Sequence, residues 1–209
     1  MKQEIENFHF VEASLQRSFK SLSEISFINR ARTPNEIELV NGPPFDFYRV
    51  SLHYMFTMEY IKLMELNKEQ YPTNHYASLE KLSITVFKNH GDNFKQKHEL
   101  NLDLLSEIRA SDFFNKLKGD RDKKFAHADS NYSDPFSFHS FSDGEIQEGS
   151  EHLKKFKLIM DNCTSVFDYE FAFQHIDSRT DNFIKFHTKY KEYYYKNYFD
   201  AMKNGCGLL

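Results

Sequence analysis

The amino-acid sequence predicts an all-α protein built as a bundle of helices. Apolar residues recur at steps of three and four along most of the 209-residue chain, which is the spacing of one helix face. No segment shows the alternation of polar and apolar residues that a half-buried strand requires. The length fits a single domain spanning 1–209, large enough to bury about 70% of its extended surface. A sizeable apolar core is therefore expected.

The N-terminal part of the chain, 1–44, is predicted to be one helix followed by a connector. Residues 4–23 carry a one-sided apolar series that should pack on the bundle. Residues 24–44 contain Thr33-Pro34 and Gly42-Pro43-Pro44. A helix interior does not tolerate proline, because the ring removes a backbone donor, so this stretch is expected to be a non-helical connector.

Three central helices are predicted in the next part of the chain, 45–130. The first covers about 46–67 and is too apolar for a surface helix, so it should lie at the centre of the bundle. The second covers about 75–90, after a turn at Tyr71-Pro72-Thr73-Asn74 that can also cap it. The third runs from about 100 to 117 as one helix.

The C-terminal part, 131–209, is predicted to be a loop followed by helices. The serine- and aromatic-rich stretch 131–141 reads as the loop, whose aromatic rings either pin it onto the core or stack on unpaired bases. The string Ser142-Asp143-Gly144-Glu145 is a capping box, flanked by Phe141 and Ile146 in the positions of a hydrophobic staple. A helix should begin there and continue to about Tyr169.

The last predicted helix, about 181–204, carries more tyrosines than one core face requires. Aromatic excess is typical of surfaces that bind a partner. We interpret these tyrosines as a homodimer face, with an RNA-binding platform and simple edge-on core packing as the alternatives. The tyrosines are Tyr190, Tyr193, Tyr194, Tyr195 and Tyr198.

Composition limits the function and the compartment. The net charge of −4 excludes a general nucleic-acid coat, so any RNA binding has to come from local charge. Cys163 and Cys206 show no pairing pattern and no metal-ligand spacing, which fits a reducing compartment. The start of the sequence carries no apolar leader and no window resembles a membrane span, so we expect a cytoplasmic protein that contacts no membrane.

Basic, acidic and imidazole groups crowd together between Gly119 and Asp129. Arg121 offers planar paired donors that match phosphate oxygens, and His127 can give or take a proton near neutral pH. Together they suit phosphodiester chemistry without a metal. His127 and Asp129 alone do not make a metal site, and the chain has no glycine-rich phosphate loop, so we expect no metal and no cofactor.

The spacing of Arg121 and His127 restricts how they can share a substrate. On one regular helix, residues six apart lie about 9 Å apart along the axis and roughly 120° apart around it. Either Gly119 ends a helix, so that Asp120 caps a new one whose first residue is Arg121, or a second copy of the chain completes the site. The first arrangement would place the guanidinium at the positive end of a helix.

At these residues the sequence resembles the HEPN superfamily, whose signature is an arginine, usually followed by a polar residue, and then a histidine a few positions later. The fuller string Arg121-Asp122-Lys123-x-x-Ala126-His127-x-Asp129 is similar to the abortive-infection U-type branch. The resemblance covers 45–130. It implies an all-α bundle of the HEPN type, here with extra N- and C-terminal helices.

The resemblance also implies a metal-independent endoribonuclease that acts as a homodimer, in phage defence or in a toxin–antitoxin pair with an antitoxin protein. The 2′-hydroxyl of RNA would attack the adjacent phosphorus. His127 would move the proton, Arg121 would neutralise charge on the phosphoryl oxygens, and Asp122 would orient one of these two groups. The remaining charged residues of the motif region would contact the RNA strand, namely Lys118, Lys123, Lys124 and Asp129.

Two alternatives stay open for this motif. Many relatives have lost activity, so the chain is either a nuclease or a non-catalytic helical module that binds a protein, a nucleotide or RNA. In the second case Arg121 would be bridged to Asp120 or Asp129 at a helix start, and His127 would be a half-buried hydrogen bonder.

Overall fold

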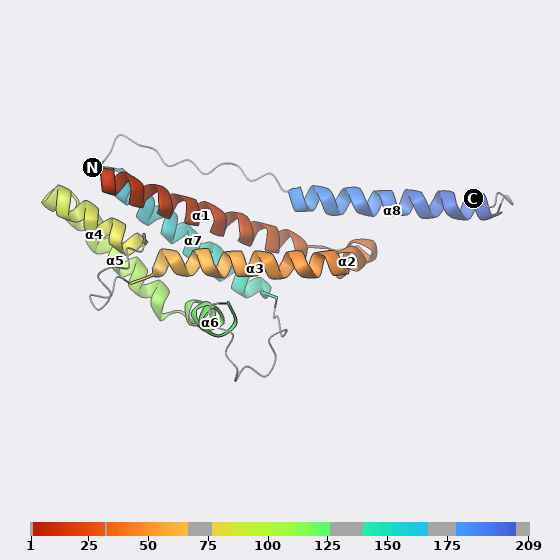
Figure 1. Cartoon of the computed structure of the whole chain (residues 1–209), viewed down its shortest axis with the longest axis horizontal. Coiled ribbons are helices and arrows are strands. Elements are labelled where there is room, and N and C mark those ends of the chain that lie inside the picture. Colours follow the sequence, from red (N-terminus) through yellow and green to blue (C-terminus); the bar gives the residue numbers. More distant parts are fainter. Residues whose placement is uncertain (1, 32, 67–76, 126–139, 167–178, 204–209) are drawn as a thin grey trace.

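The computed structural model describes 2–31, 33–66, 77–125, 140–166 and 179–203, and across these ranges the chain is helical with no strand (Figure 1). The predicted all-α class is confirmed. The elements are α1 (Lys2–Asn29), α2 (Pro34–Val40), α3 (Pro43–Met64), α4 (Leu79–His90), η1 (Gly91–Asn93), α5 (Lys95–Ala110), α6 (Asp112–Asp120), η2 (Arg121–Phe125), α7 (Asp143–Thr164) and α8 (Arg179–Lys203).

Three long helices, α1, α3 and α7, form the centre of the bundle. α1 packs along α3 and against α7, while α4 and α5 form a pair that packs on α7 (Figure 1). α3 carries fully buried Phe56 and Tyr60, and α7 carries fully buried Phe156. The prediction that the segment around 46–67 is the central helix is therefore confirmed.

An aromatic cluster around Tyr60 joins α3, α6 and α7. The centroid of the Tyr60 ring lies 5.1 Å from that of Phe156 and 6.0 Å from that of Phe113. The Tyr60 hydroxyl forms a 2.7 Å hydrogen bond with Nδ1 of the buried His152. Gly149 lets α7 approach closely, because a Cβ there would lie 3.1 Å from Phe113 Cε1. The cluster thus fixes the position of α6 against the two long helices.

A buried polar network links α4, α5 and α7. Asn101 Nδ2 donates to Ser83 Oγ at 3.0 Å, and Asn101 Oδ1 accepts from Asn162 Nδ2 at 2.8 Å. Ser83 Oγ is also 2.9 Å from His98 Nδ1. Polar groups buried in this way require partners, so the network fixes how these three helices align.

The predicted connector over 24–44 is wrong. α1 continues to Asn29, and α2 and α3 begin within the stretch. Pro34 and Pro43 each occupy the first turn of a helix, where the backbone N–H has no helical partner and proline is favoured. Thr33 and Glu36 form a capping box that starts α2, and this local signal outweighs the effect of the neighbouring proline.

The single helix predicted over 100–117 is two helices, α5 and α6. Ser111 interrupts them with an extended backbone, and its hydroxyl accepts the N–H of Phe114. Serine is a strong N-cap, and here its local hydrogen bond ends one helix and starts the next.

The remaining sequence predictions divide into confirmed elements and elements that lie outside the described ranges. α4 and the capping box of Ser142 and Glu145 at the start of α7 are confirmed. Phe141 is buried in the core, and Ile146 packs against that core. For this one ring, burial favours a loop that is pinned onto the core over stacking on unpaired bases. The turn at 71–74 and the rest of the 131–141 loop up to 139 are not described.

Within the searched ranges, every helix is too short or too polar to cross a bilayer.

We predict that His152 makes the stability of the bundle fall in mild acid. Burial, with a contribution from Lys155, lowers the pKa of His152 to about 4. Between about pH 6.5 and pH 4, His152 is protonated in the unfolded chain but stays neutral in the folded chain. The free energy of unfolding should therefore drop by about 3 kcal/mol between pH 7 and pH 4 from this group, as measured by urea denaturation at several pH values.

The matched control is His152→Asn. The asparagine side chain can still accept a hydrogen bond from the Tyr60 hydroxyl, but it does not titrate. This variant should have a lower stability at pH 7 and a flatter dependence on pH than the wild type. Parallel pH profiles for the two proteins would show that His152 is not the responsible group.

Candidate functional site

The expected helix break at Gly119 is wrong. α6 runs through Gly119 to Asp120, and the N–H of Arg121 bonds to the carbonyls of Leu117 and Lys118. Gly119 does not adopt the positive φ with which glycine ends many helices. Arg121 therefore follows α6 directly, as the first residue of the π-helical turn η2 that continues it, and it does not start a separately capped helix. Because the N–H of Arg121 is bonded within the helix, the expected attraction of a phosphate to a free helix start is not available here.

Arg121–Phe125 continues the chain as a π-helical turn, η2, packed against α3 and α6. π-helical turns are rare and occur frequently at functional sites. Two predicted site residues, His127 and Asp129, lie outside the described residues, as does the side chain of Lys124. The described half of the motif therefore consists of Arg121, Asp122 and Lys123.

Two carboxylates hold the Arg121 guanidinium. Its Nε donates to Asp122 Oδ1 at 2.8 Å, and its Nη1 donates to Glu65 Oε1 at the end of α3. Burial tends to lower the pKa of Arg121, but the hydrogen bonds and charges of these two carboxylates outweigh it and raise the pKa. The Arg121 side chain remains 20% exposed, so the guanidinium is a fixed cation whose edge reaches the surface.

Asp122 accepts a hydrogen bond from the guanidinium of Arg121, and its role in orienting one of the two principal groups stays a prediction. The sequence does not predict the contact between Arg121 and Glu65. Glu65 stands 56 positions earlier in the sequence, just past the last residue of α3, and no local pattern marks it. Only the packing of α6 on α3 brings the two side chains together. Asp129, one of the partners considered for Arg121 in the non-catalytic alternative, lies outside the described residues, so that alternative stays open.

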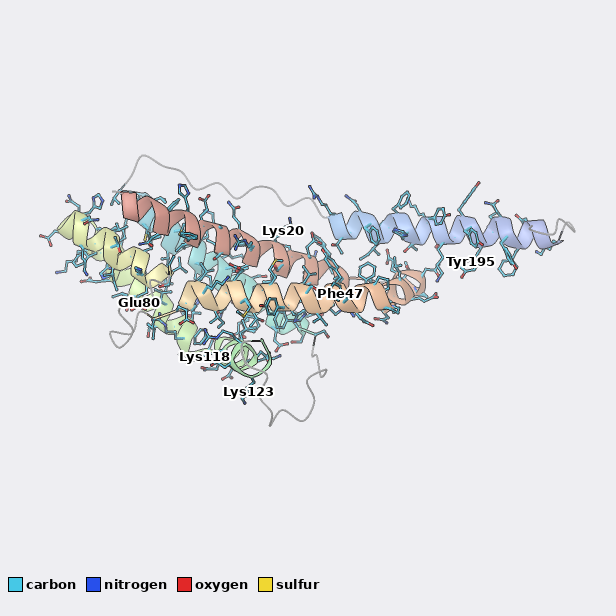
Figure 2. The ribbon with its side chains drawn as sticks, in the orientation of Figure 1. Lys20, Phe47, Glu80, Lys118, Lys123 and Tyr195 are labelled. Carbon is cyan, nitrogen blue, oxygen red and sulfur yellow. The ribbon has the colours of Figure 1, made fainter. Side chains whose placement is uncertain are left out.

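The lysines around the motif differ in whether they form an ion pair with a described carboxylate. Lys116 pairs with Glu145 in the first turn of α7, and its Nζ lies 5.9 Å from the centre of the Phe141 ring. Lys118 and Lys123 are exposed beside the end of α6, and no ion pair to them occurs among the described residues (Figure 2). Among the described residues of the motif region, these two lysines offer positive charge to a polyanion.

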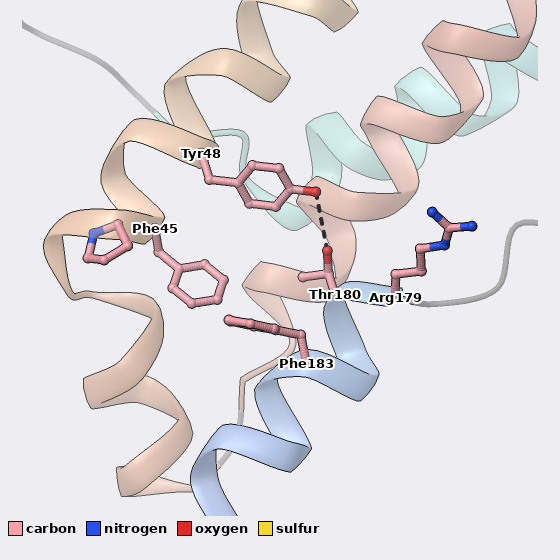
Figure 3. Close-up of a pocket in the computed structure, with 6 residues that line it drawn as sticks. Phe45, Tyr48, Arg179, Thr180 and Phe183 are labelled. Atoms are coloured by element: carbon pink, nitrogen blue, oxygen red, sulfur yellow. Dashed lines mark hydrogen bonds between the residues drawn. The ribbon is translucent and has the colours of Figure 1, made fainter. Parts of the chain in front are cut away.

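A separate cavity of about 370 Å³ lies where the first turns of α3 and α8 meet (Figure 3). Its wall is mainly aromatic, and the hydroxyls of Tyr48 and Thr180 lie 3.4 Å apart across it. The Arg179 side chain points away from the rings. α6 and α8 are well separated in Figure 1, so this cavity is not part of the Arg121 site. The other lining residues are Pro44, Phe45 and Phe183.

No group of three or more potential metal ligands occurs among the residues that were searched. A scan against protein-family models found no match, and searches of curated proteins and of solved structures found no significantly similar chain.

We predict that Arg121→Ala changes the free energy of unfolding by no more than about 1 kcal/mol in urea denaturation. The side chains of Glu65 and Asp122 are 28% and 48% exposed, so water can solvate both carboxylates once the arginine is removed. Phe113→Ala is the contrasting variant: it empties part of the Tyr60 cluster and should cost about 3–5 kcal/mol. A loss from Arg121→Ala as large as that from Phe113→Ala would mark Arg121 as a structural anchor.

Proposed function

We propose that the chain is a metal-independent endoribonuclease of the HEPN type, acting in the cytoplasm as a phage-defence or toxin–antitoxin effector. The observation that carries this proposal is the fixed guanidinium of Arg121. It stands at the end of a bundle helix, on a π-helical turn, and it is oriented by the neighbouring Asp122 of the same motif. A preoriented cation costs no reorganisation when charge develops on a phosphoryl group.

In the proposed reaction the 2′-oxygen of a ribose attacks the adjacent phosphorus and the bond from phosphorus to the 5′-oxygen breaks. His127 accepts the 2′-hydroxyl proton and returns a proton to the leaving 5′-oxygen. Arg121 balances the negative charge that builds on the phosphoryl oxygens. The products are a 2′,3′-cyclic phosphate and a 5′-hydroxyl, so all atoms and charges are accounted for without a metal.

Asp122 and Glu65 act as positioning residues for Arg121. Each accepts a hydrogen bond from a different nitrogen of the guanidinium, and these two bonds restrict its rotation. Substrate would approach the exposed edge, past Lys118 and Lys123, which would guide the strand together with Lys124 and Asp129. RNA binding here depends on local charge, because the chain as a whole is negative.

We predict that the purified wild-type chain cleaves RNA in EDTA and leaves 2′,3′-cyclic phosphate ends. Arg121→Ala and His127→Ala should each lower kcat/KM by about 100-fold or more, since one removes charge stabilisation and the other removes the proton carrier. The measurement is cleavage of an end-labelled RNA, with the ends identified by their sensitivity to phosphatase. Expression of the wild type in host cells should also slow growth and degrade RNA.

Arg30→Ala is the matched control. Arg30 is an exposed arginine at the end of α1, with its Cζ 5.7 Å from the centre of the Phe27 ring, so the variant removes one positive charge away from the motif. It should cleave RNA at the wild-type rate. Equal activity, or equal inactivity, of all four proteins would remove the nuclease proposal.

The second candidate is a non-catalytic helical module that binds a protein partner. The observation in its favour is that Arg121 already has two carboxylate partners, which is also the arrangement of an ordinary structural ion pair. This candidate predicts that RNA stays intact in the cleavage assay and that the antitoxin or another protein is bound by a surface other than the motif.

A further inference from the structure

One side of α8 faces the bundle and is buried. Thr180, Ile184 and Thr188 are each less than one-tenth exposed and recur every fourth residue. Farther along the same side, Lys191 pairs with Glu38 of α2 at 2.6 Å. These contacts attach the first part of α8 to the bundle, and the rest of the helix extends past α2 (Figure 1).

Another side of α8 carries an exposed aromatic seam, whose first residue, Phe183, also packs on Phe45 of α3 with the ring centroids 5.9 Å apart. Phe183, Phe186, Tyr190 and Tyr193 are 48%, 66%, 58% and 69% exposed, and they follow one another at steps of three, four and three. The next step of four reaches Asn197. This is the a and d spacing of a coiled coil, with Phe183, Tyr190 and Asn197 at a. The result excludes core packing as the explanation for Tyr190 and Tyr193.

The exposed area of the seam is large enough for a dimer. An aromatic side chain has about 150–250 Å² to bury, and the four seam residues and Tyr194 beside them are on average more than half exposed. Pairing two such helices would cover roughly 600 Å² on each chain, near the ~800 Å² per partner of a standard interface. A contiguous apolar patch of this size stands at the upper end of what monomers expose, and such patches are often binding sites.

The polar residues that flank the seam favour one pairing direction. Asn197 at an a position is the type of residue that fixes register and oligomer state in coiled coils, at some cost in stability. Lys189 and Lys196 occupy the g positions. In an antiparallel pair these lysines would face their own copies, whereas in a parallel pair Lys189 faces the e residue Tyr194 of the other chain. A lysine over a tyrosine ring is favourable, and two apposed lysines are not.

We propose that α8 is a dimerisation helix that pairs in parallel with α8 of a second copy of the chain, through the seam of Phe183, Phe186, Tyr190, Tyr193 and Asn197. Phe186, Tyr190 and Tyr193 are more than half exposed and lie on a different side of α8 from the buried Thr180, Ile184 and Thr188, so both attachments can exist together. Since α6 is distant from α8 in Figure 1, the dimer does not depend on the nuclease proposal, and either can fail alone.

The first test is the mass of the full-length chain, measured by sedimentation velocity over a range of concentrations. The wild type should be a dimer at micromolar concentration. The double variant F186S/Y190S should raise the dissociation constant by about 100-fold, because both rings lie at the centre of the seam. The matched control is Tyr195→Ser: Tyr195 is 48% exposed on the same helix but lies off the seam, so the variant should dimerise as the wild type does.

The second test is the pairing direction. In a Cys206→Ser background, Asn197→Cys should form a disulfide-linked dimer under mild oxidation, because the same a position meets its own copy in a parallel pair. The remaining Cys163 is buried and burial raises its pKa to about 12, so it stays unreactive. Tyr195→Cys in the same background should not cross-link.

Several results would overturn the proposal. A wild type that is monomeric at all concentrations, or a dimer unaffected by F186S/Y190S, would show that the seam does not pair. Cross-linking of a Phe183→Cys chain to an Asn197→Cys chain in preference to either alone would show an antiparallel pair. A monomer whose affinity for single-stranded RNA falls in F186S/Y190S would assign the seam to base stacking instead.

Discussion

The packing of Phe113 on Tyr60 is the contact on which the rest of the motif region depends. It joins α6 to α3 at the centre of the bundle, where His152 and Phe156 of α7 close the cluster. Glu65 follows the end of α3 and Arg121 follows the end of α6, so the packing of these two helices brings the two side chains together. The charged cluster at the surface is therefore positioned by a buried aromatic contact, and the geometry of the guanidinium is set by the core.

Periodicity was sufficient to find the long helices and insufficient to place several of their ends. The apolar series predicts α3 and α7 correctly because both helices bury large side chains in the core of the bundle. Pro34 and Pro43 favour a break in the helix when they are considered alone, although proline equally starts a helix when it stands in the first turn. Ser111 is ambiguous for a similar reason, since a serine that caps a helix has the same sequence pattern as a serine on an exposed helix face.

For the candidate site, sequence reasoning reached the contacts that are local. Arg121 and Asp122 are neighbours, so their interaction follows from the motif itself. The pairing with Glu65 depends on two helices meeting, and the helical backbone of Gly119 depends on α6 continuing into η2, so neither has a local signal. The exposed aromatic residues of α8 were visible as an excess, but only their burial pattern separates the bundle-facing side from the seam.

The π-helical turn at Arg121–Phe125 changes how distances along this motif should be counted. A π-turn takes up one residue more than an α-turn before the chain returns to the same side of the helix. Two chains that differ by a single inserted residue after the arginine can then send the following segment in the same direction, one through an α-turn and the other through a π-turn. The number of residues between the two ends of such a motif can therefore vary by one through a change of helical winding. The packing of the helices in the bundle does not have to change.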